Sequence, residues 1–145
     1  KIPPVSYDHL TNDLRQALES ADVVFVTLDL NDETLNMIAE PQIELLRGKY
    51  LINVARAAII KETALSDGLK DNVLKGFASD VWYRYPESYP EGGAGAKDDL
   101  PPANYDFYKR DNVVCVPHTG TQTTKAREIY IRQTLNQLDD YLARF

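Results

Sequence analysis

Four short runs of apolar, mostly β-branched residues constrain the fold of this chain most strongly. Three of them cover residues 23–28, 50–55 and 113–116, and the fourth lies within 73–81, centred on Gly76-Phe77-Ala78. Runs of this kind are typical of strands that are buried in a parallel sheet. Stretches with helical character lie before and between them, at 11–20, 39–47 and 62–70. This alternation predicts right-handed β-α-β crossovers, and therefore an α/β fold with one parallel sheet.

Three of the runs are followed by a residue that can carry chemistry. These residues are Arg56, Asp80 and His118. Ligands of parallel sheets bind beyond the carboxyl ends of the strands, so a fixed cation, an anion and a proton carrier should meet in one crevice. Each residue also has a purely structural interpretation, as a solvated strand-end arginine, a turn cap or a loop histidine. Their occurrence at successive strand ends favours a site.

Composition excludes several classes of function. The chain has 145 residues and a net charge of −6, and it has no cluster of Lys and Arg, which argues against a nucleic-acid surface. No apolar run approaches the ~20 residues of a membrane span, and no signal peptide is visible, which favours the cytoplasm. The single cysteine, Cys115, is expected to be a small core residue. Two histidines and one cysteine far apart give no metal-ligand spacing.

Two segments depart from the strand-helix alternation. Residues 83–112 are rich in Pro, Gly and Tyr, and about 30 residues without obvious structure is long for a compact domain. They are either a surface loop packed down by its aromatic side chains or an arm that covers substrate or contacts a subunit. Residues 121–145 predict a closing amphipathic helix, capped by Thr121 or Thr123, whose apolar stripe seeks a partner surface. The first helix should be capped by Thr11 or Asn12.

Three blocks of the sequence resemble one known family. They are Ser20 to Thr34, Asn53 to Leu65, and Gly76 to Trp82 continued by Asp111 to Gly120. They are similar to the "SADVV…LPLTPET", "NxARGxxVDExAL" and "GAALDVF…PNVxxTPHxxG" patterns of the NAD-dependent D-isomer-specific 2-hydroxyacid dehydrogenases, to which the formate dehydrogenases are related. The blocks occur in family order, and together they are specific.

The resemblance implies the C-terminal half of a doubly wound, Rossmann-like sheet with a closing C-terminal helix. Residues 1–120 would form part of an NAD(P)-binding domain, with the long loop at 83–112, and 121–145 would pack toward a substrate domain. The implied activity is hydride transfer between nicotinamide and a small D-2-hydroxy or 2-oxo acid, with NAD as cofactor and NADP not excluded. Arg56 would grip the substrate carboxylate and His118 would be the acid–base group. The implied cofactor-binding residues are Leu28, Asp29, Val54, Ala55, Arg56, Asp80, His118 and Gly120.

Departures from the family patterns leave other readings open. Tyr85 stands where the family has the glutamate that bonds the catalytic histidine. The alternatives are a non-catalytic cofactor-binding or scaffold descendant and a formate dehydrogenase-like enzyme, which shares the "DVW" run ending at Trp82. The chain has no Gly-x-Gly-x-x-Gly turn, so we expect that turn, the first strands and the substrate domain upstream of Lys1. The intact protein is expected to be a homodimer, and this fragment alone is expected to be inactive.

Overall fold

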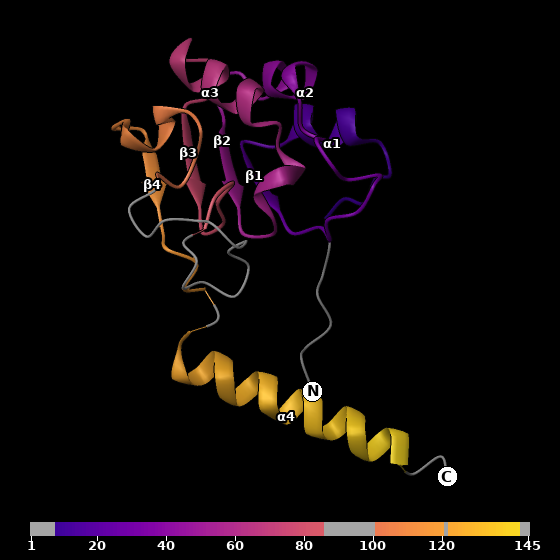
Figure 1. The fold of residues 1–145 in the computed structure, drawn as a ribbon. Helices are drawn as coiled ribbons and strands as arrows, with labels where there is room; N and C mark the ends of the chain where they lie inside the picture. The colour runs from indigo at the N-terminus through magenta and orange to yellow at the C-terminus, as the bar shows by residue number, and fades with distance from the viewer. Residues whose placement is uncertain (1–7, 86–100, 121, 143–145) are drawn as a thin grey trace.

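The computed structural model describes residues 8–85, 101–120 and 122–142. Its four strands are β1 (Val23–Val26), β2 (Tyr50–Asn53), β3 (Gly76–Ser79) and β4 (Val113–Cys115). They form one sheet in the order β1-β2-β3-β4, and every neighbouring pair is parallel (Figure 1). The predicted parallel α/β fold is therefore confirmed.

The helices of the body cover one face of this sheet. Helix α1 (Leu14–Ser20) packs against α2 (Glu40–Leu45), which packs against α3 (Glu62–Lys70). Consecutive strands are neighbours, so right-handed crossovers place the connecting helices α2 and α3 on the same side of the sheet, and α1, which precedes β1, packs beside α2. There are also two 3-10 helices among the described residues: η1 (Ala57–Ile59) follows β2, and η2 (Asp106–Lys109) precedes β4. Because the strands are parallel, Arg56, Asp80 and His118, which follow β2, β3 and β4, lie toward one edge of the sheet.

Alternation along the strands distinguishes the two faces of the sheet. On the helix side, the row that joins Val24, Leu51 and Phe77 in register lies in or against the core. The adjacent row includes Phe25 and Val114, which are both 61% exposed. One face of the sheet is therefore buried and the other is apolar but open. The strands were predicted to be buried on both faces, and within the described residues this prediction is wrong for the face that carries Phe25 and Val114.

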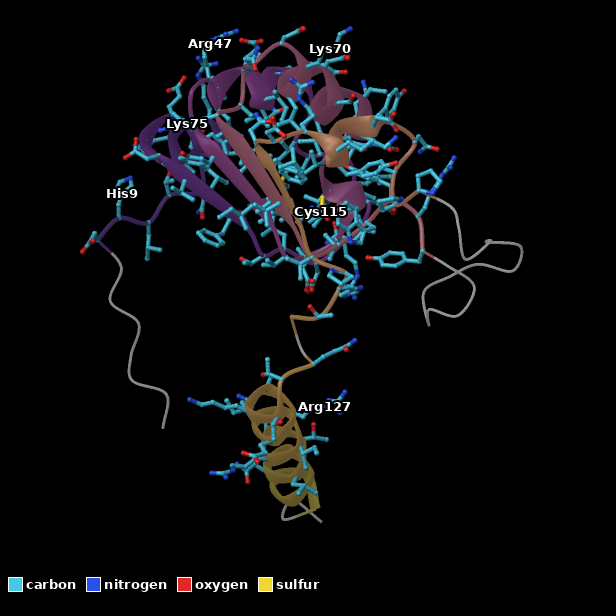
Figure 2. All side chains as sticks on the ribbon, turned by 90° about the vertical axis from the view of Figure 1, so that its left-hand side faces the viewer. His9, Arg47, Lys70, Lys75, Cys115 and Arg127 are labelled. Atoms are coloured by element: carbon cyan, nitrogen blue, oxygen red, sulfur yellow. The ribbon has the colours of Figure 1, made fainter. Side chains whose placement is uncertain are left out.

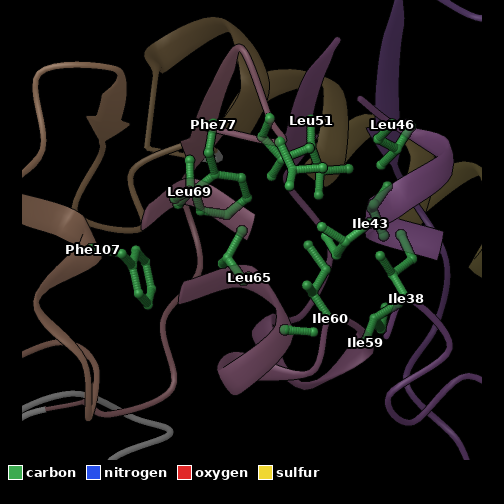
Figure 3. Packing of buried hydrophobic residues seen from close by; sticks show 14 of the residues in the cluster. Ile38, Ile43, Leu46, Leu51, Ile59, Ile60, Leu65, Leu69, Phe77 and Phe107 are labelled. Atoms are coloured by element: carbon green, nitrogen blue, oxygen red, sulfur yellow. The ribbon is translucent and has the colours of Figure 1, made fainter. Parts of the chain in front are cut away.

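The core fills the space between the sheet and the helices (Figure 3). Its largest fully buried members are aliphatic side chains from every layer: Leu18, Leu46, Leu51, Ile59, Ile60, Leu65, Leu69 and Leu74. Helix η2 adds Phe107, whose ring makes edge-on contacts with Phe77 and Tyr83. The described part of the 83–112 segment is therefore packed down by its aromatic side chains, and residues 86–100 lie outside the described residues.

The two ends of that segment meet beside the start of α3. The Arg84 N–H donates to the carbonyl of Pro102 at 3.1 Å. The Asn104 side-chain amide donates to a Glu62 carboxylate oxygen at 2.6 Å. Upstream, the Tyr83 hydroxyl donates to the carbonyl of Ile60 at 2.7 Å, and burial raises the pKa of this phenol. The base of the segment is thus closed by hydrogen bonds to the body.

The helix caps show which of several candidate residues the fold uses. Asp13 caps α1, since its side chain accepts from the N–H of Gln16, so the prediction of Thr11 or Asn12 was wrong. The run Thr-Asn-Asp offers three capping residues, and the sequence does not rank them. Thr123 caps α4 (Thr124–Leu142), accepting from the N–H of Ala126 at 3.1 Å, as one of the two alternatives predicted.

Helix α4 lies beyond the carboxyl edge of the sheet and apart from the body in both views (Figure 1, Figure 2). Its side chains Ile129, Ile131 and Leu135 are about half exposed or more, at 48%, 58% and 54%. Within the described residues it therefore presents apolar groups to solvent. No helix in the described part of the chain is long and apolar enough to cross a membrane.

Cys115 is exposed, which corrects the expectation of a core residue (Figure 2). It ends β4, which among the described strands pairs only with β3, so a run that was predicted to be a buried strand lies at the edge of the described sheet. The thiol still contacts the body, with its Sγ 3.5 Å from the carbonyl of Tyr108. Partial burial raises the pKa of this thiol.

Candidate functional site

A pocket of about 470 Å³ opens where the chain leaves β1 and β2. Its lining comprises two loop segments, Thr27 to Leu30 and Val54 to Arg56. Leu28 and Val54 present apolar surface there, at 46% and 51% exposure. The pocket brings together five of the eight predicted cofactor-binding residues: Leu28, Asp29, Val54, Ala55 and Arg56.

The first pocket loop is held by a polar turn. The Asn31 carboxamide oxygen accepts from the backbone N–H groups of Glu33 and Thr34. The Thr34 hydroxyl donates to the carbonyl of Asp29 at 2.6 Å and accepts from the N–H of Asn31 at 2.9 Å. A short side chain that bonds its own backbone fixes a turn in this way. Asp29, a predicted cofactor contact, thus lies on a hydrogen-bonded pocket rim, and sequence reasoning missed Thr34 as its support.

The second pocket loop is held by Asn53, the last residue of β2, which is 1% exposed. Its amide nitrogen donates to the carbonyl of Arg56 at 3.0 Å, and its oxygen accepts from the N–H of Ala55 at 3.1 Å. The guanidinium of Arg56 is exposed, and its Nη1 donates to the carbonyl of Ala55 at 2.9 Å. One terminal nitrogen of the guanidinium is held in this way, and the remaining N–H groups can offer parallel donors to a carboxylate.

A second group of predicted residues follows β3 and β4. The Asp80 carboxylate accepts from two consecutive amides, that of Thr119 at 2.7 Å and that of Gly120 at 2.8 Å. His118 directly precedes these two amides in the chain. It is half-buried, and its backbone lies in the left-handed region with φ +53°. Asp80, His118 and Gly120 are therefore brought together, at the same edge of the sheet as the pocket.

An aromatic ring lies against the imidazole of His118. The Tyr85 and His118 ring centroids are 5.5 Å apart, with the planes tilted by 43°. The Tyr85 hydroxyl oxygen accepts from the backbone N–H of Trp82 at 2.9 Å, and the Trp82 indole donates to the carbonyl of Val116 at 2.9 Å. Tyr85, which the sequence resemblance aligns with the family glutamate, is thus itself hydrogen-bonded to the segment after β3.

The family model described as D-isomer specific 2-hydroxyacid dehydrogenase, NAD binding domain, matches residues 5–120. The chain belongs to this family. Its four-stranded parallel sheet is accordingly a portion of a Rossmann-like NAD-binding domain. No group of three or more His, Cys, Asp or Glu side chains placed to hold a metal ion occurs among the residues that the structure describes.

Similar proteins place this 2-hydroxyacid dehydrogenase domain within longer chains. A glyoxylate reductase from Thermofilum pendens is 34% identical over 117 residues, which are 80% of this chain and 30% of the relative. The structure of a D-isomer specific 2-hydroxyacid dehydrogenase from Xanthobacter autotrophicus Py2 matches with 28% identity and a TM-score of 0.56, covering 72% of this chain and 31% of that one.

A third relative shares the fold at lower identity. The NADPH-dependent glyoxylate/hydroxypyruvate reductase from Sinorhizobium meliloti, solved in complex with NADP and malonate, matches with a TM-score of 0.65 and 21% identity over 85% of this chain and 35% of that one. The chain spans about a third of the length of the relatives that it matches.

Proposed function

We propose that this chain forms part of an NAD(P)-dependent oxidoreductase that acts on a small D-2-hydroxy or 2-oxo acid. One observation carries the proposal: the strand-end pocket that Arg56 lines shares the carboxyl edge of the sheet with His118. A cation suited to a carboxylate and a group that transfers protons are the two elements that reduction of a 2-oxo acid requires. The similarity to a glyoxylate reductase supports a substrate of this size.

The residues present suit one side of a dinucleotide. The exposed apolar side chains of Leu28 and Val54 offer flat surface, while the backbone of Asp29 and Ala55 lies on the pocket rim. Asp80 and Gly120, after the next strands, would lie toward the nicotinamide end. The chain has no Gly-x-Gly-x-x-Gly turn, so the pyrophosphate would be held by other residues of the intact protein. When bound, the nicotinamide supplies or accepts the hydride.

Arg56 and His118 have different tasks in the proposed reaction. Arg56 binds the substrate carboxylate through parallel hydrogen bonds and polarises the neighbouring carbonyl. His118 donates a proton to the carbonyl oxygen during reduction and removes it from the hydroxyl during oxidation. Both side chains must therefore reach one substrate, which the common strand edge makes geometrically reasonable.

A non-catalytic, cofactor-binding descendant is the second candidate. The observation that favours it is Tyr85, whose ring lies against His118 where the family resemblance places a carboxylate. A carboxylate there would stabilise the imidazolium, and a phenol ring supplies no such charge. A formate dehydrogenase-like activity, suggested by the run ending at Trp82, is the remaining variant of the enzyme proposal.

Steady-state kinetics of the full-length protein with glyoxylate, other 2-oxo acids and formate, each with NAD(H) and NADP(H), tests these candidates. Arg56→Lys should lower kcat/KM at least about tenfold, since a lost hydrogen bond to a charged group is worth roughly 1.5–3 kcal/mol. His118→Asn should abolish reduction and leave cofactor affinity largely intact.

Matched controls are available within the chain. Arg47→Lys changes an exposed arginine paired with Glu44 at the far end of the body, and His9→Asn changes an exposed histidine (Figure 2). Both should leave the kinetics unchanged. Turnover that survives Arg56→Lys and His118→Asn would remove these residues from the site. Cofactor binding without turnover of any substrate would favour the non-catalytic candidate.

The proposal also includes the unpaired edge of β1 and the open face of the sheet beside it, which the remainder of the protein, or a second copy, would cover. Strand β1 pairs only with β2 among the described strands, and Phe25 on its open face is exposed. An unpaired apolar edge of this kind promotes association. We therefore expect this chain, expressed alone, to self-associate and to bind NAD weakly, and the full-length protein to be a homodimer. Size-exclusion chromatography with mass spectrometry, and a cofactor titration, measure both; a stable isolated monomer that binds NAD tightly would refute the expectation.

A further inference from the structure

We infer that the segment from Asp80 to Trp82 is a clamp that positions His118 by gripping the backbone on both sides of it. Asp80 and Trp82 are thus positioning residues, and this inference rests on the function proposed above. It gives Asp80 a role that its predicted contact with the cofactor does not include.

The grip after His118 comes from Asp80. Both carboxylate oxygens are engaged, one by the amide of Thr119 at 2.7 Å and the other by that of Gly120 at 2.8 Å. Hydrogen bonds from amides to an ionised carboxylate are shorter and stronger than those between neutral groups. The carboxylate therefore fixes the direction in which the chain leaves His118.

Gly120 provides an independent sign that this contact is tight. A Cβ atom at this position would lie 2.7 Å from Oδ2 of Asp80, closer than a Cβ atom approaches a non-bonded oxygen. The backbone of Gly120 is outside the left-handed region, so glycine is needed there for space and not for conformation. The clamp thus explains why a residue without a side chain follows Thr119.

The grip before His118 comes from Trp82. Its indole N–H donates to the carbonyl of Val116 at 2.9 Å, and the N–H of His118 donates to the same carbonyl at 3.0 Å. His118 itself is held at φ +53°, a conformation that a residue with a side chain adopts only when its surroundings impose it. The backbone on either side of His118 is therefore bonded to a single three-residue segment after β3.

The arrangement predicts that Asp80 acts on the reaction through His118. Asp80→Asn keeps one acceptor oxygen but turns an amide NH2 group toward an N–H, so one grip is lost. A misplacement of about 1 Å in a catalytic group can cost about 10²-fold in rate, and we expect a loss of that order in kcat. The dissociation constant of the cofactor should stay close to that of the parent. Trp82→Phe, which keeps an aromatic ring but removes the indole donor, should lower kcat in the same direction.

The test uses the full-length protein with two readouts. Kinetics and cofactor titration separate kcat from binding, and NMR of ¹⁵N-labelled histidine side chains reports the surroundings of His118 without turnover. The His118 signal, assigned with His118→Asn, should shift in Asp80→Asn. Asp111→Asn, an exposed carboxylate away from this edge, is the matched control and should shift nothing.

A double-mutant cycle makes the inference specific. Gly120→Ala should lower kcat and shift the His118 signal in the parent, but should have little further effect in an Asp80→Ala background, where no Oδ2 opposes the new methyl group. Equal effects of Gly120→Ala in both backgrounds would overturn the clamp. So would an Asp80→Asn variant that loses cofactor affinity while kcat and the His118 signal are unchanged. If the parent turns over no substrate, the proposed function fails, and the NMR signal still decides the clamp.

Discussion

The close contact between helices α2 and α3 predicts whether an alanine at position 68 raises or lowers the stability of the protein. Gly68 lies in α3, and a Cβ atom there would be 2.5 Å from Cγ2 of Ile43 in α2. Carbon atoms at optimal separation are about 3.5–4.0 Å apart. Ile43 is 3% exposed, and its branch at Cβ cannot swing away as a flexible side-chain end could. The helices can therefore approach this closely only with glycine at position 68.

Gly68→Ala combines two opposed effects on the free energy of unfolding. Alanine is favoured over glycine inside a helix by about 1 kcal/mol. Overpacking a filled core costs typically about 1–3 kcal/mol. Since neither partner of the contact is free to move, the steric cost should win, and Gly68→Ala should destabilise the full-length protein by about 1 kcal/mol. Urea unfolding followed by circular dichroism measures the change.

Ile43→Leu supplies the decisive second background because leucine has no Cγ2 atom. In that background the clash is removed, and Gly68→Ala should become neutral or stabilising by up to about 1 kcal/mol. Gly48→Ala is the control: nothing lies within 4 Å of its Cβ position, but its φ of +74° disfavours alanine by about 1–2 kcal/mol in either background. A Gly68→Ala protein at least as stable as the parent, with Ile43 unchanged, would refute the reasoning.

Three further predictions concern single side chains near the site. Asn53→Ala should lower the stability by about 1–3 kcal/mol and should also lower kcat/KM, because it leaves buried backbone groups without partners and frees the loop that carries Arg56. Urea unfolding and kinetics measure the two losses. Asn53→Asp, which keeps only the acceptor, should recover part of each. Tyr83→Phe should cost about 1 kcal/mol in the same unfolding assay through the lost hydrogen bond to Ile60, and an unchanged stability would contradict it. Because partial burial raises the pKa of Cys115, its iodoacetamide labelling at pH 8, followed by peptide mass spectrometry, should be slower in the folded protein than in urea. The same shift means that folding favours the neutral thiol, so the contribution of this group to stability falls as the pH rises above 9.0, its ordinary value; equal labelling rates in both states would argue against the shift.

The order of the fold could be predicted because local and long-range signals agree. Helix α3 begins and ends at the predicted residues, since apolar spacing and flanking strands mark the same bounds. The carboxyl-edge position of Arg56, Asp80 and His118 followed from the parallel topology alone. β1, in contrast, ends at Val26 although its apolar run continues, because the following residues leave the sheet to line the pocket.

The contacts inside the site could not be predicted, since they join residues far apart in the chain. Asp80 was expected to face a cofactor, and nothing local indicates that amides 39 and 40 positions later bind both of its oxygens. The ring of Tyr85 against His118 likewise depends on how two strand ends converge. The burial of Cys115 was predicted wrongly for a different reason. An edge strand and a central strand can have the same apolar composition, so the sequence of β4 does not show that its residues are exposed.

The hydrogen-bonded base of the 83–112 segment has a consequence for how this protein can change during evolution. Arg84 is joined to Pro102, and Asn104 to Glu62, so the two stems stay together whatever length of chain runs between them. The entropy of closing a loop grows only with the logarithm of its length, and each doubling costs about 0.6 kcal/mol. Insertions and deletions between the stems would therefore be nearly neutral for the sheet and for the loop that carries His118. This makes the region between β3 and β4 the part of the domain in which new surface can be acquired without rebuilding the site.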